Sequence, residues 1–275
     1  MLTHVDVMPQ VMGVLNVTPD SFSDGGRYVT VAAAVDRAAC MVAEGAAFID
    51  VGGESTRPGA PPVSAAEELE RVVPVLEALR GRFPVTLSVD TSKPEVMVAA
   101  LAAGASLLND VRALCLPGAL EVAAKSNARI CLMHMRGEPA TMQRDPHYDD
   151  VVAEVGVFLA ERVAACEAAG IARARLLVDP GFGFGKALQH NQSLLRRLPV
   201  LVESLGLPIL VGLSRKSMIG VMLGQTPGSV ASRLHGSLAL AVIAAWQGAS
   251  IVRVHEVKET VEVLRITHAV RTGSQ

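Results

Sequence analysis

The chain has 275 residues with 25 Lys and Arg against 27 Asp and Glu, and half of its residues are apolar. A chain this apolar buries enough surface to offset its ordering entropy, which excludes intrinsic disorder. The formal charge of −2 and the 3% aromatic content also argue against a nucleic-acid partner, which needs a basic face or stacking side chains.

Eight short runs rich in Val, Leu and Ile recur along the chain, and most of them are apolar at consecutive positions. Runs of this kind are typical of parallel strands, which are covered on both faces. They predict strands at residues 11–17, 47–51, 85–89, 106–108, 129–133, 175–178, 209–213 and 250–254.

Longer Ala-rich stretches with helical spacing separate these runs. They predict helices at residues 31–44, 64–80, 94–103, 118–126, 151–169, 191–205, 229–246 and 257–271. Ser64 followed by Glu67 forms the pattern of a capping box, which places a helix start there. Glycines that end helices follow several of these stretches, as at Gly104 and Gly170.

Eight strand–helix units in about 265 residues predict an α/β fold, a single (β/α)₈ TIM barrel. We expect one domain over residues 1–275, with residues 1–10 as a short N-terminal lead. A doubly wound open sheet is the alternative, but the first predicted strand is not followed by the glycines of a dinucleotide-binding turn.

The cysteines and the hydropathy pattern bear on location. Cys40, Cys115, Cys131 and Cys166 form no C-x-x-C pair and are expected to be free, buried thiols in a reducing compartment. We also expect no signal peptide, since residues 1–10 have no basic head and no apolar run. The longest uncharged stretch, residues 236–252, is too short for a membrane span. These features predict a cytoplasmic protein with no membrane partner.

Polar residues follow every predicted strand, and the carboxyl ends of barrel strands are where active sites form. They are Asn16; Asp50 with Glu54, Ser55, Thr56 and Arg57; Asp90; Asn109 and Asp110; His134; Asp179; Ser214, Arg215 and Lys216; and Arg253 with His255. Turns alone rarely place such residues after all eight strands, so we expect a binding site at this end of the barrel.

These residues divide into two chemical sets. Asp90, Asn109, Asp179 and Lys216 supply acceptors and donors that suit a planar, nitrogen-rich ring. The second set is a basic, donor-rich edge that suits an anion, and it consists of Asn16, Arg57, Arg253 and His255. The sequence therefore predicts a phosphorylated heterocycle as ligand.

At these positions the chain resembles the dihydropteroate synthases. The matching motifs are GVLNVTPDSFSDGG at 13–26, DVGGESTRPG at 50–59, SVDT at 88–91, ND at 109–110, MHM at 133–135, TMQ at 141–143, DPGFGFGK at 179–186, SRKS at 214–217 and RVH at 253–255. The resemblance runs in order from about residue 11 to residue 270, and the ordered set is very specific. Glu256 departs from it, because the family pattern has Asp there.

The resemblance implies that the chain joins 6-hydroxymethyl-7,8-dihydropterin diphosphate to p-aminobenzoate, giving 7,8-dihydropteroate and diphosphate for folate synthesis. It implies that the partners are these small molecules and a second copy of the chain in a homodimer, for which residues 236–246 are a candidate surface. It also implies Mg²⁺ as cofactor, and sulfonamides as inhibitors.

The resemblance assigns residues to three subsites. It implies that the pterin is bound by Asp90, Asn109, Asp179 and Lys216. The implied diphosphate site is Asn16, Thr56, Arg57, Arg253 and His255, with the metal at Asn16. The implied p-aminobenzoate pocket is Phe22, Ser55, Thr56, Arg57, Pro58, Phe184, Lys216 and Ser217.

We expect an ionising, SN1-like alkyl transfer, because cations stabilise the leaving diphosphate and the aryl amine is already neutral. Two other functions remain open: a pterin-binding methyltransferase domain, and a non-catalytic pterin-binding protein. The roles of two residues are also open: Lys216 could be a Schiff-base lysine, and His134 could be a buried histidine without a role in the site. Residues 181–186 are interpreted as a tight turn rather than a phosphate loop.

Overall fold

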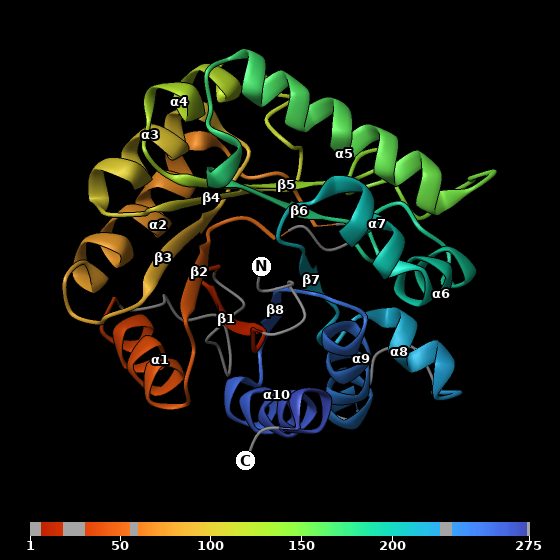
Figure 1. Cartoon of the computed structure of the whole chain (residues 1–275). Helices are drawn as coiled ribbons and strands as arrows, with labels where there is room; N and C mark the ends of the chain where they lie inside the picture. Colours follow the sequence, from red (N-terminus) through yellow and green to blue (C-terminus); the bar gives the residue numbers. More distant parts are fainter. Residues whose placement is uncertain (1–6, 19–30, 56–59, 226–232, 274–275) are drawn as a thin grey trace.

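A computed structural model describes residues 7–18, 31–55, 60–225 and 233–273. Eight parallel strands form a barrel at the centre of the molecule (Figure 1). The strands are β1 (Gln10–Asn16), β2 (Phe48–Gly52), β3 (Thr86–Asp90), β4 (Leu107–Asp110), β5 (Arg129–Met133), β6 (Leu176–Asp179), β7 (Leu210–Gly212) and β8 (Ile251–Val254). The hydrogen-bonded order is β6-β5-β4-β3-β2-β1-β8-β7, and one isolated bridge between Val178 and Ile209 joins β6 to β7.

Helices surround the strands on the outside (Figure 1). They are α1 (Val31–Ala43), α2 (Ala65–Leu79), α3 (Pro94–Ala103), α4 (Ala119–Lys125), α5 (Val151–Ala168), α6 (Leu188–Arg196), α7 (Leu198–Leu205), α8 (Ser217–Met222), α9 (Leu234–Trp246) and α10 (Val257–Thr272), with a short 3₁₀ turn, η1 (Arg173–Arg175). The predicted (β/α)₈ barrel is thus confirmed, and the doubly wound sheet is wrong.

Alternation along the strands divides the core in two. Residues that point outward pack under the helices in one large apolar cluster. Inward-pointing residues form a smaller cluster inside the barrel, and these are Met12, Phe48, Leu107, Cys131, Leu177, Leu210 and Ile251. Two positions further along their strands, Asp50, Asn109, Asp179 and Arg253 face inward as well. The barrel interior therefore changes from apolar to polar toward the carboxyl ends of the strands.

The predicted elements agree closely with the structure. Strand 129–133 and helix 94–103 have the predicted bounds, and the ends of the other strands lie within two residues of the predicted ones. The capping box is present: Glu67 N donates to Ser64 Oγ at 3.2 Å, and Ser64 N donates to Glu67 Oε2 at 3.0 Å.

Three differences from the predicted helices remain: one prediction is wrong, one helix was not predicted, and one predicted start is not tested. The helix predicted at 191–205 is two helices that meet at Arg197, because Pro199 has no N–H to continue the first one. The short helix α8 was not predicted, since six residues are too few to show a periodic pattern. The helix predicted from residue 229 is described from Leu234 onward, and residues 226–232 lie outside the described residues.

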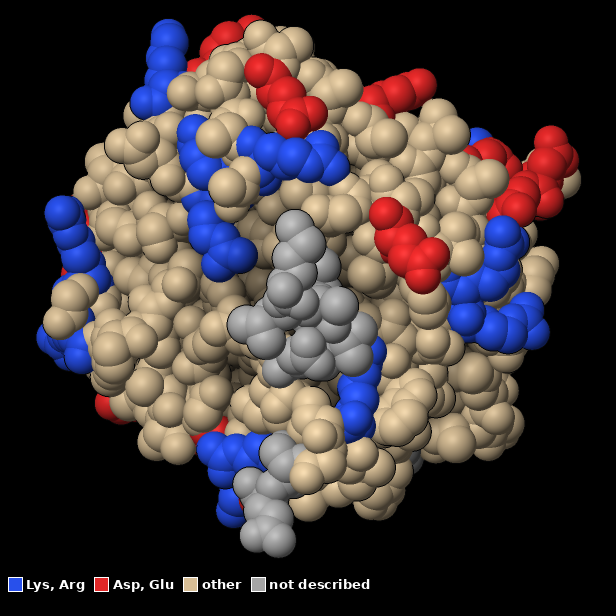
Figure 2. Space-filling model, in the orientation of Figure 1, with Lys and Arg blue, Asp and Glu red and all other residues tan. Residues whose placement is uncertain are grey.

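The face of the molecule in Figure 2 carries charges of both signs. On the face shown in Figure 2, Lys and Arg side chains are interspersed with Asp and Glu side chains instead of gathering in one patch. Within the described residues, no helix combines the length and hydropathy that a membrane crossing requires. All four cysteines are free thiols, but only Cys131 and Cys166 are buried; the predicted burial is wrong for Cys40 and Cys115, which are exposed.

Candidate active site

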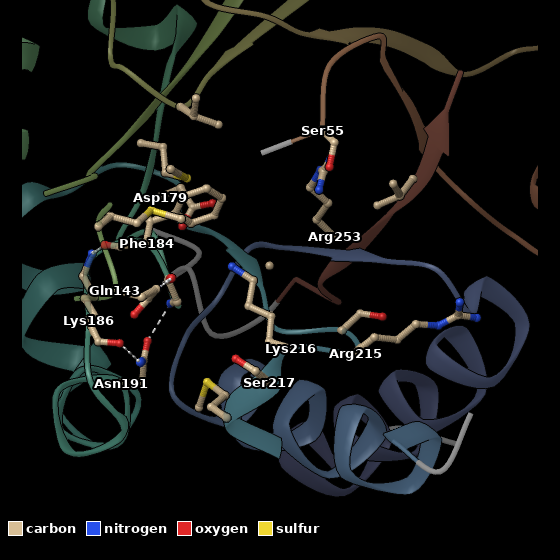
Figure 3. A pocket seen from close by; sticks show the side chains of 18 of the residues that line it. Ser55, Gln143, Asp179, Phe184, Lys186, Asn191, Arg215, Lys216, Ser217 and Arg253 are labelled. Atoms are coloured by element: carbon tan, nitrogen blue, oxygen red, sulfur yellow. Dashed lines mark hydrogen bonds between the residues drawn. The ribbon is translucent and has the colours of Figure 1, made fainter. Parts of the chain in front are cut away.

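The site lies at the carboxyl ends of the strands, where a cavity of about 580 Å³ opens (Figure 3). Ten predicted site residues line this one cavity: Asn16, Ser55, Asp90, Asn109, Asp179, Phe184, Lys216, Ser217, Arg253 and His255. The other four, Phe22, Thr56, Arg57 and Pro58, lie outside the described residues. The structure thus brings together every predicted site residue that it describes.

Four polar side chains form a connected group, which we call the Arg253 clamp: Asp50, Asp90, Asn109 and Arg253. The last three line this cavity, and Asp50 lies behind them. Arg253 Nε donates to Asp50 Oδ2 at 2.6 Å, and Arg253 Nη2 donates to Asp90 Oδ2 at 2.8 Å. The same oxygen of Asp50 accepts a hydrogen bond from Asn109 Nδ2 at 3.0 Å. The clamp therefore links β2, β3, β4 and β8 across the barrel interior.

Burial and charge act against each other in the clamp. Burial raises the pKa of Asp90 to about 7, although the Arg253 guanidinium opposes this shift. Burial by itself would lower the pKa of Arg253, but Asp50 and Asp90 outweigh it and raise that pKa. The guanidinium is thus a permanent cation, whereas Asp90 can change charge near neutral pH.

Asp179 and Lys216 face the cavity from the opposite side (Figure 3). Burial raises the pKa of Asp179, while a hydrogen bond from Gly181 N at 2.7 Å to its Oδ1 acts in the other direction. Lys216 Nζ donates to the carbonyl of Phe182 and lies 4.4 Å from the centre of the Phe184 ring. Burial lowers the pKa of Lys216 to about 8, with Asp179 opposing the shift.

The turn between β6 and α6 is fixed by a buried lysine. Lys186 Nζ bonds His134 Nδ1 at 2.8 Å and donates to the carbonyls of Gly181 at 2.9 Å and Phe184 at 3.0 Å. Gly181 has φ of +69°, and a Cβ there would lie 1.8 Å from His134 O, so only glycine fits. This geometry agrees with the interpretation of residues 181–186 as a tight turn.

His134 itself is a buried part of this turn. Burial lowers its pKa to about 3, helped by the charges of Lys186 and Arg136, so its ring is neutral at pH 7. The ring also packs edge-on against Phe158, with centroids 5.0 Å apart. His134 does not line the cavity. These contacts favour the interpretation of His134 as a buried histidine without a role in the site.

His255 belongs to a second polar group at the cavity edge. Its Nδ1 lies 2.9 Å from Ser214 Oγ, and Ser214 Oγ donates to Glu256 Oε2 at 3.1 Å. Glu256 also accepts a hydrogen bond from Arg215 Nε. Glu256, the departure from the family pattern, therefore holds the turn that follows β7 instead of weakening it.

Not every polar residue after a strand faces the site. Asp110 comes directly after Asn109 and so points to the opposite side of β4. It is fully buried, and its carboxylate accepts from Leu114 N at 2.7 Å, Arg112 N at 2.8 Å and Ser92 Oγ. Asp110 thus stabilises the turn after β4 and has no place in the cavity.

The start of the β2–α2 loop is held by a lysine between two glutamates. Lys93 Nζ donates to Glu54 Oε2 and to Glu68 Oε2. Glu54 also accepts from Val63 N at 3.1 Å, so one carboxylate connects both described ends of this loop. The Glu68 side chain is fully buried, and within the described residues its Oε1 has no hydrogen-bond partner. Glu68 therefore depends on Lys93 for compensation of its charge.

We expect Lys93→Met to lower the free energy of unfolding by about 3 kcal/mol, because it leaves the buried Glu68 carboxylate without a counter-charge. Urea denaturation would measure the change. Arg112→Met is the matched control, since it breaks the ion pair with Glu138, whose side chain is 63% exposed. That control should cost less than about 1 kcal/mol. Equal losses in the two variants would contradict the role given to Lys93.

Asn16 is the only residue for which the family resemblance implies a metal. Among the described residues, no group of three or more His, Cys, Asp or Glu side chains is arranged to hold a metal ion. A Cβ placed on Gly52 would lie 3.5 Å from Asn16 Oδ1 and 3.9 Å from Asp90 Oδ2, so these two oxygens flank one point at the cavity wall. Mg²⁺ commonly takes few protein ligands together with substrate phosphates and water. The residues present fit an ion that binds together with a phosphate ligand.

Several residues of the site escaped prediction as site residues. Asn191 on α6 accepts from Gly183 N at 2.7 Å and donates to the Lys186 carbonyl at 3.0 Å (Figure 3). Gln143 donates to the carbonyl of Gly183. No sequence pattern marks Asn191, because one polar residue in a helix resembles any solvated position. Asp50 was recognised after β2, but its pairing with Arg253 has no signature in the sequence.

Comparison with known proteins identifies close relatives. The family model for the pterin binding enzymes matches residues 12–255. The dihydropteroate synthase of Escherichia coli K12 is 58% identical over 267 residues, covering 97% of this chain and 93% of that protein. The crystal structure of the Yersinia pestis dihydropteroate synthase with a sulfonamide drug complex is 55% identical with a TM-score of 0.91, covering 96% of this chain and 95% of that one. The Xanthomonas albilineans dihydropteroate synthase in complex with 7,8-dihydropteroate is 50% identical with a TM-score of 0.87, covering 98% and 95%.

Proposed function

Since the chain belongs to the pterin binding enzymes, and within them to the dihydropteroate synthases, we propose which of its residues bind each part of the substrates. The reaction is the condensation of 6-hydroxymethyl-7,8-dihydropterin diphosphate with p-aminobenzoate. The products are 7,8-dihydropteroate and diphosphate. One observation supports the division best: the buried Asp179 and Asn109 meet Asp90, Lys216 and Arg253 in one cavity.

We assign the pterin ring to Asp90, Asn109, Asp179 and Lys216. The ring carries N–H donors along one edge, and buried carboxylates accept such bonds with strength and direction. Asp179 is only 6% exposed and Asn109 only 4%, so their polar atoms gain little from water. A ligand that satisfies them is therefore favoured over one that leaves them unpaired.

We assign the diphosphate to Arg253, His255 and Asn16, together with Thr56 and Arg57. Support comes from the permanent charge of Arg253 and from the position of His255 on the turn after β8. Loops after the last two strands commonly bind phosphate in barrels of this kind.

The p-aminobenzoate pocket is assigned to Ser55, Phe184, Lys216 and Ser217, with Phe22, Thr56, Arg57 and Pro58. The Phe184 ring offers an apolar face for the aryl group, and the Lys216 ammonium stands 4.4 Å from its centre. A cation beside an aromatic face suits a ligand with a benzene ring and a carboxylate. Sulfonamides, which bind a relative of this chain, are expected in the same pocket.

The proposed chemistry is an ionising transfer without a covalent enzyme intermediate. Departure of diphosphate places negative charge beside Arg253 and His255, and the Asp90 carboxylate stands close to the cation that forms on the pterin side. Incubation of substrate carrying ¹⁸O between the pterin methylene and the first phosphorus, without p-aminobenzoate, should move part of the label to the non-bridging oxygens of that phosphoryl group, because the departed diphosphate turns before it recombines. Absence of scrambling while the complete reaction proceeds would argue for a concerted displacement.

Mg²⁺ is proposed at Asn16, where it would neutralise charge on the diphosphate. Because the protein offers few ligands there, Mg²⁺ should bind detectably by calorimetry only when diphosphate is present. Equal binding without diphosphate would place the ion elsewhere.

The function is tested by diphosphate release, measured with and without p-aminobenzoate in the presence of Mg²⁺. Release that depends on p-aminobenzoate and yields dihydropteroate supports the synthase. Tight pterin binding with no release would instead favour the methyltransferase or binding-protein alternatives and overturn the assignment of the diphosphate residues.

Activity should have a narrow optimum between pH 7 and pH 8. Protonation removes the negative charge of Asp90 and turns one of its acceptor oxygens into a donor, so its pKa of about 7 makes kcat/KM fall as the pH drops below that value. Lys216 loses its charge above its pKa of about 8, so kcat/KM falls again at higher pH. A pH–rate profile checks both limbs. Lys216→Arg should remove the basic limb, because a guanidinium stays charged to about pH 12. A flat wild-type profile would contradict these assignments.

We further propose a homodimer built on the side of the barrel that carries α8, α9 and α10 (Figure 1). Large apolar side chains are exposed there, among them Val221 at 61%, Trp246 at 52% and Val270 at 69%. Such a patch is unusual on a monomer. Sedimentation equilibrium should give a dimer for the wild type and a monomer for Trp246→Lys, and a wild-type monomer would refute the proposal.

A cytoplasmic location and a single domain over the whole chain also remain proposals. The four free thiols support the first, since they persist in a reducing compartment. Cell fractionation tests the location. One cooperative calorimetric transition would support a single domain, and two separate transitions would oppose it.

A further inference from the structure

The carboxylate groups of the Arg253 clamp differ in what they can reach. Asp90 lines the cavity, and its Oδ2 accepts from Arg253 Nη2 at 2.8 Å. Asp50 does not line the cavity, and its side chain is fully buried. Asp50 therefore cannot touch a substrate, whereas Asp90 can.

Arg253 and a bound pterin compete for one carboxylate, if Asp90 holds the ring as proposed above. A carboxylate oxygen that already accepts from a guanidinium is a weaker acceptor for a second donor, so the ring bonds Asp90 Oδ2 best once the Nη2 end of Arg253 has left it. The terminal nitrogens of the guanidinium are the groups that would meet the diphosphate. A turn of these nitrogens toward the diphosphate therefore takes Nη2 away from Asp90.

Asp50 is placed to hold Arg253 through that movement. The Arg253 Nε–H, which lies nearer the main chain than the two terminal nitrogens, donates to Asp50 Oδ2 at 2.6 Å. Asn109 Nδ2 fixes this same oxygen from the other side at 3.0 Å. The second oxygen of Asp50, Oδ1, is buried and has no hydrogen-bond partner within the described residues. It can accept a further N–H as the guanidinium turns.

We propose that Asp50 is a positioning residue on which the Arg253 guanidinium turns, so that Arg253 exchanges Asp90 for the diphosphate while its Nε–H stays on Asp50. This proposal rests on the proposed function, which gives Asp90 to the ring and Arg253 to the diphosphate. Asp50 thereby couples the two subsites: arrival of the diphosphate frees Asp90 for the ring.

Calorimetry with two unreactive probes tests the proposal. The probes are 6-hydroxymethylpterin alone, and inorganic diphosphate in the presence of saturating 6-hydroxymethylpterin. Asp50→Asn should weaken diphosphate binding on the order of 10–100-fold, because the charge that orients the guanidinium is lost. The affinity for 6-hydroxymethylpterin should change less than about threefold, since Asn still offers an oxygen to Asn109.

Two comparisons show whether Asp50 acts through Arg253. In an Arg253→Lys background, which keeps a cation but lacks the forked guanidinium, Asp50→Asn should add less than about threefold to the loss. Ser88→Ala is the matched control, because Ser88 lies opposite Asp50 in the β2–β3 register and its buried Oγ has no partner within the described residues. That control should leave both affinities unchanged.

Each outcome has a separate meaning. A wild type that does not bind inorganic diphosphate would overturn the proposed diphosphate site. If the wild type binds diphosphate, two results would overturn the role of Asp50. One is that Asp50→Asn weakens the binding of both ligands equally. The other is that Asp50→Asn weakens diphosphate binding as much in the Arg253→Lys background as in the wild type. If Asp50→Asn does not fold, NMR of the wild type tests the proposal through the Arg253 Nε–H resonance. This proton should stay protected from solvent exchange when both probes are bound, because it stays on Asp50. Loss of protection would refute the proposed role of Asp50.

Discussion

Asp179→Ala is expected to abolish binding of the pterin ring, with a loss of affinity on the order of 10³-fold or more. Asp179 is buried beside the cavity, so a ring donor placed there has no water to replace the carboxylate. Removal of the side chain also leaves Gly181 N without its acceptor at 2.7 Å, which loosens the turn that carries Phe184. Isothermal titration with 6-hydroxymethylpterin measures the loss.

The companion variant Asp179→Asn separates these two effects. Its oxygen can still accept from Gly181 N, while its amide presents a donor where the ring needs an acceptor. It should keep the turn and the thermal stability but still lose pterin binding. Unchanged pterin affinity in either variant would mean that the ring binds elsewhere in the cavity.

Arg253→Ala is expected to lower kcat on the order of 10²–10³-fold, because the negative charge that develops on the leaving diphosphate loses its main cation. The substitution also leaves the buried Asp50 without the partner that lies 2.6 Å away, so some loss of stability accompanies the loss of rate. Steady-state kinetics with saturating substrates, combined with a thermal melt, distinguish the two.

Arg253→Lys provides the comparison for this prediction. It restores a positive charge but not a fork that can reach two carboxylates, so its kcat should lie between those of the wild type and Arg253→Ala. A kcat for Arg253→Ala within about threefold of the wild type would show that departure of the diphosphate does not limit the rate.

The sequence predicts the positions of the site better than its internal bonds. Strand alternation puts Asp50, Asn109 and Arg253 on the inner face, and it separates Asn109 from Asp110, which lies on the other face. This alternation does not predict which inward-pointing side chains form hydrogen bonds with each other. The bond between Arg253 and Asp50 joins residues 203 positions apart, and only the closed barrel brings them together.

The β6–α6 turn shows the same limit. The glycines of residues 181–186 predict a tight turn, but the three groups that Lys186 holds there come from two separate segments. A lysine in a loop normally indicates a solvated side chain. Its burial at 2% exposure follows from packing of the β5–α5 segment over the turn, which local pattern does not encode.

The barrel is closed between β6 and β7 by a single bridge. Every other neighbouring pair of strands shares a run of paired residues, while here Val178 pairs with Ile209 alone and its N–H donates to Pro208 O at 3.1 Å. In native-state hydrogen exchange, the Val178 amide should therefore exchange faster than amides in the middle of β2 or β3. Asp179 ends β6 and Lys216 follows β7, so they lie on opposite sides of this weakly paired junction. A ligand that bonds both residues therefore holds β6 and β7 together. Saturating pterin should slow exchange at Val178 more than anywhere else along the strands.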